Sequence, residues 1–376
     1  MKVYCIADNI ISPLGNTSKD NFEEVKAGKA RVQQVSNPRL MPVPFFASSM
    51  KATLNDGLDG YTRFERLCIA SISDAMKSTP VNLANGDTIL ILSTTKGNIE
   101  LIKSAVMDET IIAQVSLAKT ATKIGKHFKA KHTPIVVSNA CISGVLALIV
   151  AKRLLLTKQY KNAVVVGADI LSQFVVSGFQ SLMAMSDEPC RPFDRDRKGI
   201  NLGEGAATIV LTTDEQMTDS NSALIIGEGL SNDANHISGP SRTGAELAHA
   251  VQLAMAGSGV GPSELSFVSA HGTATIYNDE MESKAFEIAG LTAVPLHSLK
   301  GYYGHTLGAA GLIESVLCIH SLRNNVVLAS KNYEVNGVPI PLNINIEVVR
   351  STKFYALKTA SGFGGCNAAV VFSKKG

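Results

Sequence analysis

Short apolar runs alternate along the chain with longer stretches that have a helical pattern. The runs typical of strands fall at residues 3–7, 88–92, 134–137, 163–166, 207–211, 223–226, 265–269, 354–357 and 368–372. Helical patterns fall at residues 66–76, 143–156, 244–255, 279–288 and 312–322. Strands that alternate with helices predict an α/β fold. The uninterrupted apolar run at 163–166 predicts a central strand that is covered on both faces.

The two halves of the chain show the same order of elements. Residues 134–170 predict a strand, a turn, an apolar helix and a second strand, and residues 293–330 repeat that order with a last strand at 326–328. Each half then closes with two strands joined by a glycine-containing turn. The polar stretch TDSNS at 218–222 lies between the halves and is typical of a linker. We therefore predict two similar domains, residues 1–218 and residues 219–376.

Composition narrows the class of protein. Of the 376 residues, 45% are hydrophobic and 18% are charged, which provides for a large core and excludes a disordered chain. A net charge of only +3 and the absence of tryptophan argue against a nucleic-acid binder. The longest apolar run, at 142–151, is well short of the roughly 20 residues that a membrane helix needs. Six cysteines without a CxxC pair, and no signal sequence, favour reduced thiols in the cytoplasm.

Cys141 lies in the sequence SNACISG, between a short apolar strand and an apolar helix. A cysteine in the first turn of a helix meets aligned backbone N–H groups and the positive end of the helix dipole, and both favour a nucleophilic thiolate. The small neighbouring residues would let a substrate approach the sulfur. A buried cysteine that only fills space would fit the same position.

Two histidines occupy positions that suit a ligand site. His271, in HGTAT, follows the apolar strand at 265–269, and ligands of α/β proteins usually bind at such strand ends. His305 and Lys300 lie in SLKGYYGHTLGAAG, whose small residues allow a thin ligand or a backbone to come close. Taken singly, a hydrogen-bonded loop histidine or a surface lysine would explain each of them.

The sequence SGFGGCNA at 361–368 joins two predicted strands through three glycines in four residues. Gly364 and Gly365 can adopt positive φ and direct backbone N–H groups into a cleft, where they could form an oxyanion hole with the N–H of Cys141. A thiol, two imidazoles, a lysine and these donors together suit thioester chemistry. The chain has no HExxH motif, paired Cys/His spacing, phosphate loop or GxGxxG motif, so we expect no metal and no bound cofactor.

The motifs SNACISG, HGTAT, SLKGYYGHTLGAAG and GFGGCNAAVVF, in this order and spacing, resemble those of the β-ketoacyl-acyl carrier protein synthases of the elongating, Cys-His-His type. CRPFDRDR at 190–197 and GEGA at 203–206 extend the likeness over almost the whole chain. The resemblance implies an α/β, thiolase-like fold of two similar βαβαβαββ halves stacked in five layers (αβαβα). It also implies a homodimer whose partner, acyl carrier protein, brings the substrates on its phosphopantetheine arm.

The resemblance implies a decarboxylative Claisen condensation with four catalytic residues. Cys141 would take an acyl group from the carrier protein. His271 and His305 would donate N–H bonds to the thioester oxygen of malonyl-carrier protein as CO₂ leaves, and the resulting carbanion would attack the Cys141 thioester. Lys300 would tune the two histidines electrostatically.

The resemblance also implies a set of substrate-binding residues. Thr273 and Thr275 would hydrogen-bond the pantetheine arm, and Phe363 would gate the acyl pocket. Glu314 lies at the family's spacing from the lysine that it is expected to bind. The backbone N–H groups of Cys141 and Phe363 would hold the oxyanion.

Several residues depart from the family's pattern, and they leave the substrate open. The departures are Lys198, Ile200 and Asn201 after RPFDRDR, Ile276 and Tyr277 after HGTAT, and Cys366 where threonine is usual. The segment between residues 92 and 141, which normally helps to line the partner's acyl pocket, is shorter than usual. Fatty acid elongation and a specialised polyene or polyketide pathway therefore both fit.

Three alternative classes of protein can be distinguished from this family at single residues. A chain-length-factor-like partner subunit of a heterodimer is the alternative function, but such subunits typically lack the nucleophile that is present here as Cys141. Starter-type synthases have asparagine where His305 stands, and a thiolase has its second cysteine at the position of Phe363. For the acidic carrier we expect contacts at Arg63, Arg66 and the basic residues at 123–131, because opposite charge steers encounter.

Overall fold

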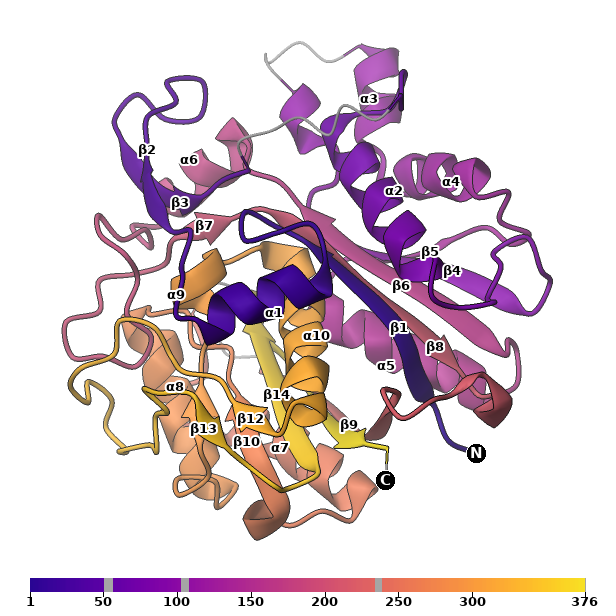
Figure 1. Ribbon diagram of the computed structural model, residues 1–376. Helices are drawn as coiled ribbons and strands as arrows, with labels where there is room; N and C mark the ends of the chain where they lie inside the picture. The colour runs from indigo at the N-terminus through magenta and orange to yellow at the C-terminus, as the bar shows by residue number, and fades with distance from the viewer. Residues whose placement is uncertain (51–56, 103–107, 234–238, 376) are drawn as a thin grey trace.

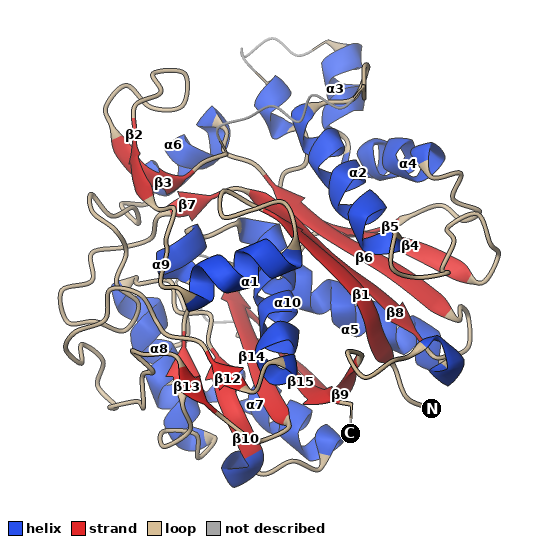
Figure 2. Ribbon diagram, viewed as in Figure 1, coloured by secondary structure: helices blue, strands red, loops and turns tan. Residues whose placement is uncertain are grey.

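A ten-stranded mixed sheet forms the body of the protein in the computed structural model, which describes residues 1–50, 57–102, 108–233 and 239–375 (Figures 1 and 2). In spatial order the strands are β11 (Leu296–His297), β10 (Leu265–Ser269), β14 (Tyr355–Gly362), β15 (Cys366–Lys374), β9 (Ala223–Asn232), β1 (Tyr4–Ile11), β8 (Gly205–Thr212), β6 (Asn162–Asp169), β4 (Thr88–Ser93) and β5 (Ile135–Val137). From each edge inward, three parallel strands are followed by two antiparallel ones. The same order therefore occurs twice, and β1 and β9 join the two sets.

Helices cover both outer faces and fill the space between the two sets of strands. The outer helices are α2 (Arg63–Met76) and α4 (Leu117–His127) on the N-terminal set and α7 (Ala245–Ser258) and α8 (Ile276–Ile288) on the C-terminal set. Between the sets lie α5 (Ser143–Leu156) and α10 (Ala310–Arg323), which contact strands of both (Figure 1). A helix that is apolar all round is stable only when buried, and this explains why these two sequences form the central layer. The structure thus has the two similar halves and five layers that the resemblance implied.

The two central helices touch backbone to backbone near their N-termini. A Cβ added to Gly144 would lie 2.7 Å from the backbone nitrogen of Leu312, and one added to Gly311 would lie 2.7 Å from that of Val145. Only glycine permits this approach at either position. The contact brings the segments that precede α5 and α10, which carry Cys141 and His305, to the same place.

The remaining elements flank this body, and one of them differs from the prediction. They are α1 (Ser18–Lys26), β2 (Gln33–Val35), β3 (Phe45–Ser48), α3 (Glu109–Val115), α6 (Gln173–Ser181), β7 (Leu202–Gly203), α9 (Lys300–Tyr303), β12 (Val326–Val327) and β13 (Val349–Arg350). The strand predicted at 326–328 is β12, which pairs only with β13, away from the large sheet. β14 takes the place beside β10 instead. The domain boundary predicted at residues 218–219 falls between β8 and β9 and stays a prediction.

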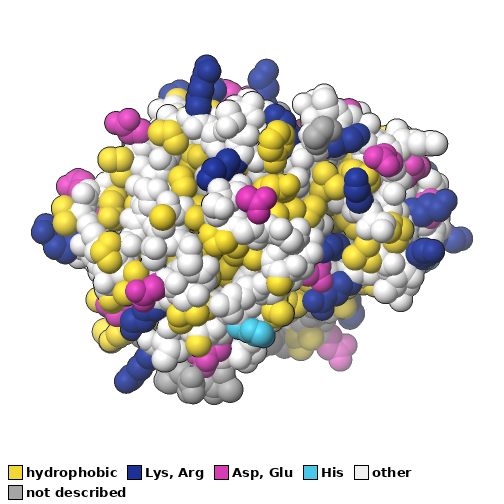
Figure 3. All heavy atoms as spheres, turned by 90° about the horizontal axis from the view of Figure 1, so that it is seen from below, with side chains coloured by type: hydrophobic (Ala, Val, Ile, Leu, Met, Phe, Trp, Pro, Cys, Tyr) yellow, Lys and Arg dark blue, Asp and Glu magenta, His cyan; other side chains and the backbone are white. Residues whose placement is uncertain are grey.

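The surface shows mixed charge. On the face drawn in Figure 3, Lys and Arg side chains are interspersed with Asp and Glu, in keeping with the small net charge.

Among the described helices, none combines the length and the apolar character needed to cross a bilayer.

Candidate active site

Cys141 sits on a strained turn between β5 and α5. Ala140 has a left-handed φ of +42°, which is unfavourable for a residue with a Cβ. Ser143 holds the turn, because its Oγ donates to the carbonyl of Ala140 at 2.6 Å and accepts from the N–H of Asn139 at 2.8 Å. The nucleophile was predicted in the first turn of the helix. The structure instead places it two residues before Ser143, the first helical residue.

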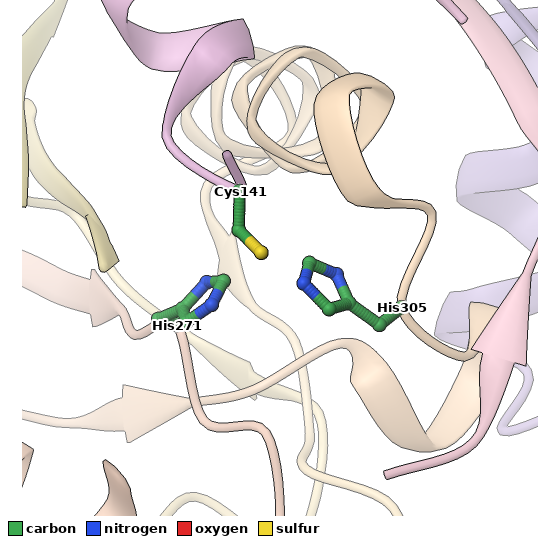
Figure 4. A group of neighbouring side chains, drawn as sticks. All are labelled: Cys141, His271 and His305. Carbon is green, nitrogen blue, oxygen red and sulfur yellow. The ribbon is translucent and has the colours of Figure 1, made fainter. Parts of the chain in front are cut away.

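His271 and His305 come from distant segments and meet beside the thiol (Figure 4). Their ring centroids are 5.1 Å apart at 81°, and the Cys141 Sγ and one nitrogen of each ring lie within 4.8 Å of one another. The turn after β10 is held by Glu282 of α8, which accepts from the backbone N–H of His271 at 2.8 Å. His305 is held by Asn201, whose carbonyl accepts its N–H at 2.7 Å. This bond uses the backbone of residue 201, whereas the Asn201 side chain binds the segment before it, accepting from the N–H of Cys190 at 2.6 Å.

Both histidines are kept neutral by their surroundings. They are 2% and 1% exposed, and burial is the largest cause of pKa values well below the usual range, followed by the positive charge of Lys300. His271 Nδ1 and both ring nitrogens of His305 have no hydrogen-bond partner among the described residues. Neutral imidazoles with unused nitrogens can donate to a ligand or accept a proton from one.

The thiol of Cys141 differs from the expectation of an acidic cysteine. Burial raises its pKa to about 12, and the charge of Lys300 opposes this only in part. The sulfur is therefore protonated at rest near neutral pH. A base must take its proton during attack, and the two neutral imidazoles are within reach.

The predicted pair of Lys300 and Glu314 is present, and both side chains are buried. A second lysine that the sequence reading missed, Lys358 of β14, contacts the other carboxylate oxygen of Glu314 at 2.8 Å. A lysine inside β14, whose other residues are apolar, small or uncharged, was the available signal. Glu314 was expected among the substrate-binding residues, but it is buried, contacts both lysines and is not part of the lining of the cavity described below.

A cavity of about 1100 Å³ opens at the thiol and the two histidines. Thr273, Thr275 and Phe363 line it, as the substrate-binding prediction requires. The two threonine hydroxyls are 2.8 Å apart, and the Phe363 ring stacks on Phe179 with centroids 5.9 Å apart. The lining also includes four of the departures (Lys198, Ile200, Ile276 and Tyr277) and two cationic residues that were not predicted (Arg242 and Lys284).

The turn between β14 and β15 approaches Cys141 closely. Gly364 and Gly365 have φ of +85° and +74°, the left-handed conformation that their sequence allowed. A Cβ on Gly362 would lie 2.9 Å from the Cys141 backbone nitrogen, so glycine is required there. The segment that leads into Phe363 is thereby brought against the Cys141 backbone.

Cys141, His271 and His305 also form the one group of three Cys, His, Asp or Glu side chains, among those described, that could hold a metal ion. The expectation that the protein uses no metal and no bound cofactor stays a prediction.

The basic residues expected to contact a carrier protein have other partners. Arg63 binds Glu204 with Nη1 at 2.9 Å from the carboxylate, and Lys123 binds Glu65 at 2.7 Å. Arg66 donates to the carbonyl of Tyr61 at 2.9 Å. None of the three basic residues lines the cavity.

Comparisons with known proteins cover most of the chain. The family model of the β-ketoacyl synthase N-terminal domain matches residues 61–217, and that of the C-terminal domain matches residues 222–334. The 3-oxoacyl-[acyl-carrier-protein] synthase 2 of Mycobacterium bovis is 31% identical over 271 residues, which are 68% of this chain and 64% of that protein. The alignment thus spans just under two thirds of this relative's length.

Solved structures match the fold over the full length. A β-ketoacyl synthase from Burkholderia phymatum is similar with a TM-score of 0.90 at 25% identity, and the match covers 100% of both chains. A chain from the complex of a ketosynthase with its chain length factor from Xenorhabdus doucetiae gives a TM-score of 0.89 at 25% identity, covering 100% of this chain and 98% of that one. The fold is therefore the thiolase-like fold of the ketosynthases.

Proposed function

This chain belongs to the β-ketoacyl synthase family, and we propose that it joins a malonyl unit to an acyl group held as a thioester on Cys141. The observation that carries the proposal is the meeting of one thiol and two neutral imidazoles at the end of a cavity of about 1100 Å³. Acyl carrier protein would deliver both substrates on its phosphopantetheine arm. The arm belongs to the substrates, and the chain's own residues supply the chemistry.

The first step is acyl transfer. An imidazole takes the Cys141 proton while the sulfur attacks the acyl thioester carbonyl. The bond between that carbonyl carbon and the pantetheine sulfur then breaks, and the pantetheine thiol leaves with a proton. Lys300 favours this step, because its charge opposes the rise in the pKa of the Cys141 thiol.

The second step is decarboxylation of the malonyl group. The bond from its α-carbon to the carboxylate breaks, CO₂ leaves, and the electron pair becomes an enolate whose oxygen accepts N–H bonds from His271 and His305. Neutral donors suit this step, since an imidazolium would pair with the malonyl carboxylate and stabilise the reactant.

The third step is condensation. The enolate carbon attacks the acyl carbonyl on Cys141, and the backbone N–H groups of Cys141 and Phe363 would hold the resulting oxyanion. Collapse of this intermediate expels the Cys141 thiolate and leaves β-ketoacyl-carrier protein. The close approach of Gly362 to the Cys141 nitrogen supports this assignment of the donors.

For the carrier we propose docking at the mouth of the cavity instead of at the predicted basic residues. Arg242 and Lys284 line it, and Lys284 donates to the carbonyl of Arg242 at 2.8 Å. Lys198 lies there too, paired with Asp187 at 3.4 Å. An acidic carrier protein would complement the positive charges of Arg242 and Lys284.

A second chain would complete this site. Phe174, Leu182 and Met183 are 55%, 47% and 90% exposed, and the last two line the cavity. Exposed apolar side chains grouped in this way indicate a protein interface. We propose a homodimer. A heterodimer with a chain-length-factor-like subunit is the alternative, supported by the complex named in the Xenorhabdus doucetiae structure.

The pathway is fatty acid or specialised polyene or polyketide synthesis, in the cytoplasm. The six described cysteines are all free thiols, as reducing conditions favour.

The proposal is tested by the mass of the enzyme after incubation with acyl-carrier protein. The wild type should gain one acyl group, and Cys141→Ala should gain none. Acylation of Cys141→Ala, or no acylation of the wild type with any primer, would contradict the assignment of the nucleophile.

A further inference from the structure

Lys358 is a fully buried cation in the middle of β14. Its Nζ donates to the carbonyls of Ser269 at 3.2 Å, Ala270 at 3.3 Å and Thr359 at 2.5 Å, and it lies 2.8 Å from Glu314 Oε2. All of its hydrogen bonds are thus taken up inside the protein. Burying an ammonium group costs free energy unless its charge is paired. A fully buried lysine in a strand therefore suggests a functional role.

Glu314 carries one negative charge and contacts two lysines. Lys300 contacts one of its carboxylate oxygens and Lys358 the other, from α9 and β14 respectively. One negative charge balances one of the two positive charges. With both lysines charged, the buried cluster therefore has one excess positive charge.

This excess charge lies against the segment that carries His271. Ser269 and Ala270, whose carbonyls bind Lys358, are the two residues before His271, and β10 pairs with β14 at Ser269 and Lys358. The ionisable groups that act on the histidine pair, on Cys141, on Glu282 or on the lysine cluster are Lys300, Glu314, Lys358, Cys141, Cys366, Lys96, Asp169, Asp279, Glu282 and His297. Of these, Lys300 and Lys358 are the cations that act directly on the histidines.

We infer that Lys358 is a positioning residue for the malonyl half of the reaction, holding His271 in place and keeping both imidazoles as neutral donors for the enolate. The inference rests on the proposed function. The pKa of each histidine is lowered in part by Lys358, after burial and Lys300. Lys300, and not Lys358, is among the main influences on the pKa of Cys141. Lys358 therefore acts mainly on decarboxylation, which uses both imidazoles as donors, whereas Lys300 acts on both half-reactions.

The test separates the two half-reactions in Lys358→Met, Lys358→Gln and wild type. We expect the rate of CO₂ release from malonyl-carrier protein to fall about tenfold or more. Acylation of Cys141 by acyl-carrier protein should fall less than decarboxylation, because it uses one imidazole as a base, whereas decarboxylation needs both imidazoles as donors. Lys353→Met is the matched control, since Lys353 also donates to a β10 carbonyl, that of Leu265 at 3.1 Å, but is exposed. It should leave both rates unchanged.

A pH profile distinguishes charge from simple structural support. Removing a cation raises the pKa of both histidines, so they become protonated at higher pH and the acid limb of decarboxylation moves to higher pH. Lys358→Gln keeps hydrogen-bond donors at this position but removes the charge. If Lys358→Met does not fold, Lys358→Gln is sufficient for the test. An unmoved acid limb, equal loss of both half-reactions, or wild-type decarboxylation in Lys358→Gln would overturn the inference. If wild type neither decarboxylates malonyl-carrier protein nor becomes acylated, the proposed function itself fails.

Discussion

The carboxylate of Glu282 accepts the backbone N–H of His271 at 2.8 Å and so fixes the turn that presents this imidazole. Its other oxygen accepts the N–H of Gly272 at 2.6 Å and the side-chain amide of Asn278 at 2.9 Å. A buried acid in α8 thus sets the position of a histidine that lies eleven residues earlier in the chain. Its removal tests how far the site depends on this support.

Glu282→Ala should lower the free energy of unfolding by about 3 kcal/mol, because it leaves buried N–H donors unsatisfied. It should also slow decarboxylation, because the turn that carries His271 loses its anchor. Urea unfolding and CO₂ release measure the two effects. A variant with wild-type stability and rate would show that the turn keeps its conformation without Glu282.

The same group predicts how stability changes with pH. Burial raises the pKa of Glu282 to about 7, above the ordinary value of 4.5. The folded state therefore binds this proton more tightly than the unfolded state, and the group's contribution to stability is present below pH 4.5 and is lost as the pH rises to about 7. Asp279, with a pKa raised to about 6, acts in the same direction. Unfolding measured from pH 4.5 to 7.5 should show a shallower fall for Glu282→Gln than for wild type, and identical slopes would argue against the shifted pKa.

His271→Ala should slow decarboxylation of malonyl-carrier protein by about 10²- to 10³-fold, the usual effect of losing one donor to an oxyanion. His249→Ala, an exposed histidine of α7, is the control and should have no effect. Single-turnover CO₂ release is the measurement. Equal rates in the wild type and His271→Ala would remove this histidine from the proposed enolate site.

The contact between the central helices can be tested with two matched glycines. Gly311→Ala should destabilise the protein by about 1–3 kcal/mol, because the new Cβ meets the Val145 nitrogen at 2.7 Å. Gly257→Ala in α7 meets nothing within 4 Å and should instead stabilise by about 0.5–1 kcal/mol. Chemical unfolding of both variants measures the two changes in the free energy of unfolding. A neutral Gly311→Ala would mean that α5 and α10 can separate without cost.

Charge reversal at the cavity mouth tests the carrier surface. Arg242→Glu with Lys284→Glu should raise KM for acyl-carrier protein about tenfold at low salt, and leave KM for free acyl-pantetheine unchanged. Lys131→Glu, an exposed lysine of the basic cluster first predicted for this contact, is the control. A larger effect of Lys131→Glu would return the contact to that cluster.

Sequence reasoning located the three reacting side chains because each follows or precedes a recognisable strand or helix. Cys141 precedes an apolar helix, His271 ends an apolar strand and His305 precedes the second apolar helix, and the repeated order of elements brings such positions together. The α/β class followed from the same alternation, whereas the five layers were implied by the family resemblance. Their roles in catalysis stay predictions until they are measured.

What sequence reasoning missed depends on burial and on pairing between distant residues. The pKa of Cys141 was expected to be low because the helix end was considered without the desolvation that dominates it. Lys358 was passed over because its partner Glu314 lies 44 positions earlier, in a helix. Arg63 looked like a surface cation, yet it binds the buried Glu204. The role of a charged residue can be assigned only when the three-dimensional structure shows its partners.

The central claim is tested most directly by the mass of carrier protein after the enzyme has acted on malonyl-carrier protein together with a panel of acyl-carrier primers. The account predicts a β-ketoacyl product with the wild type, and none with Cys141→Ala. The preferred primer would identify the pathway. Carrier protein that is only decarboxylated, or unchanged with every primer, would contradict the condensing role and would favour a subunit that works only beside a second, different chain.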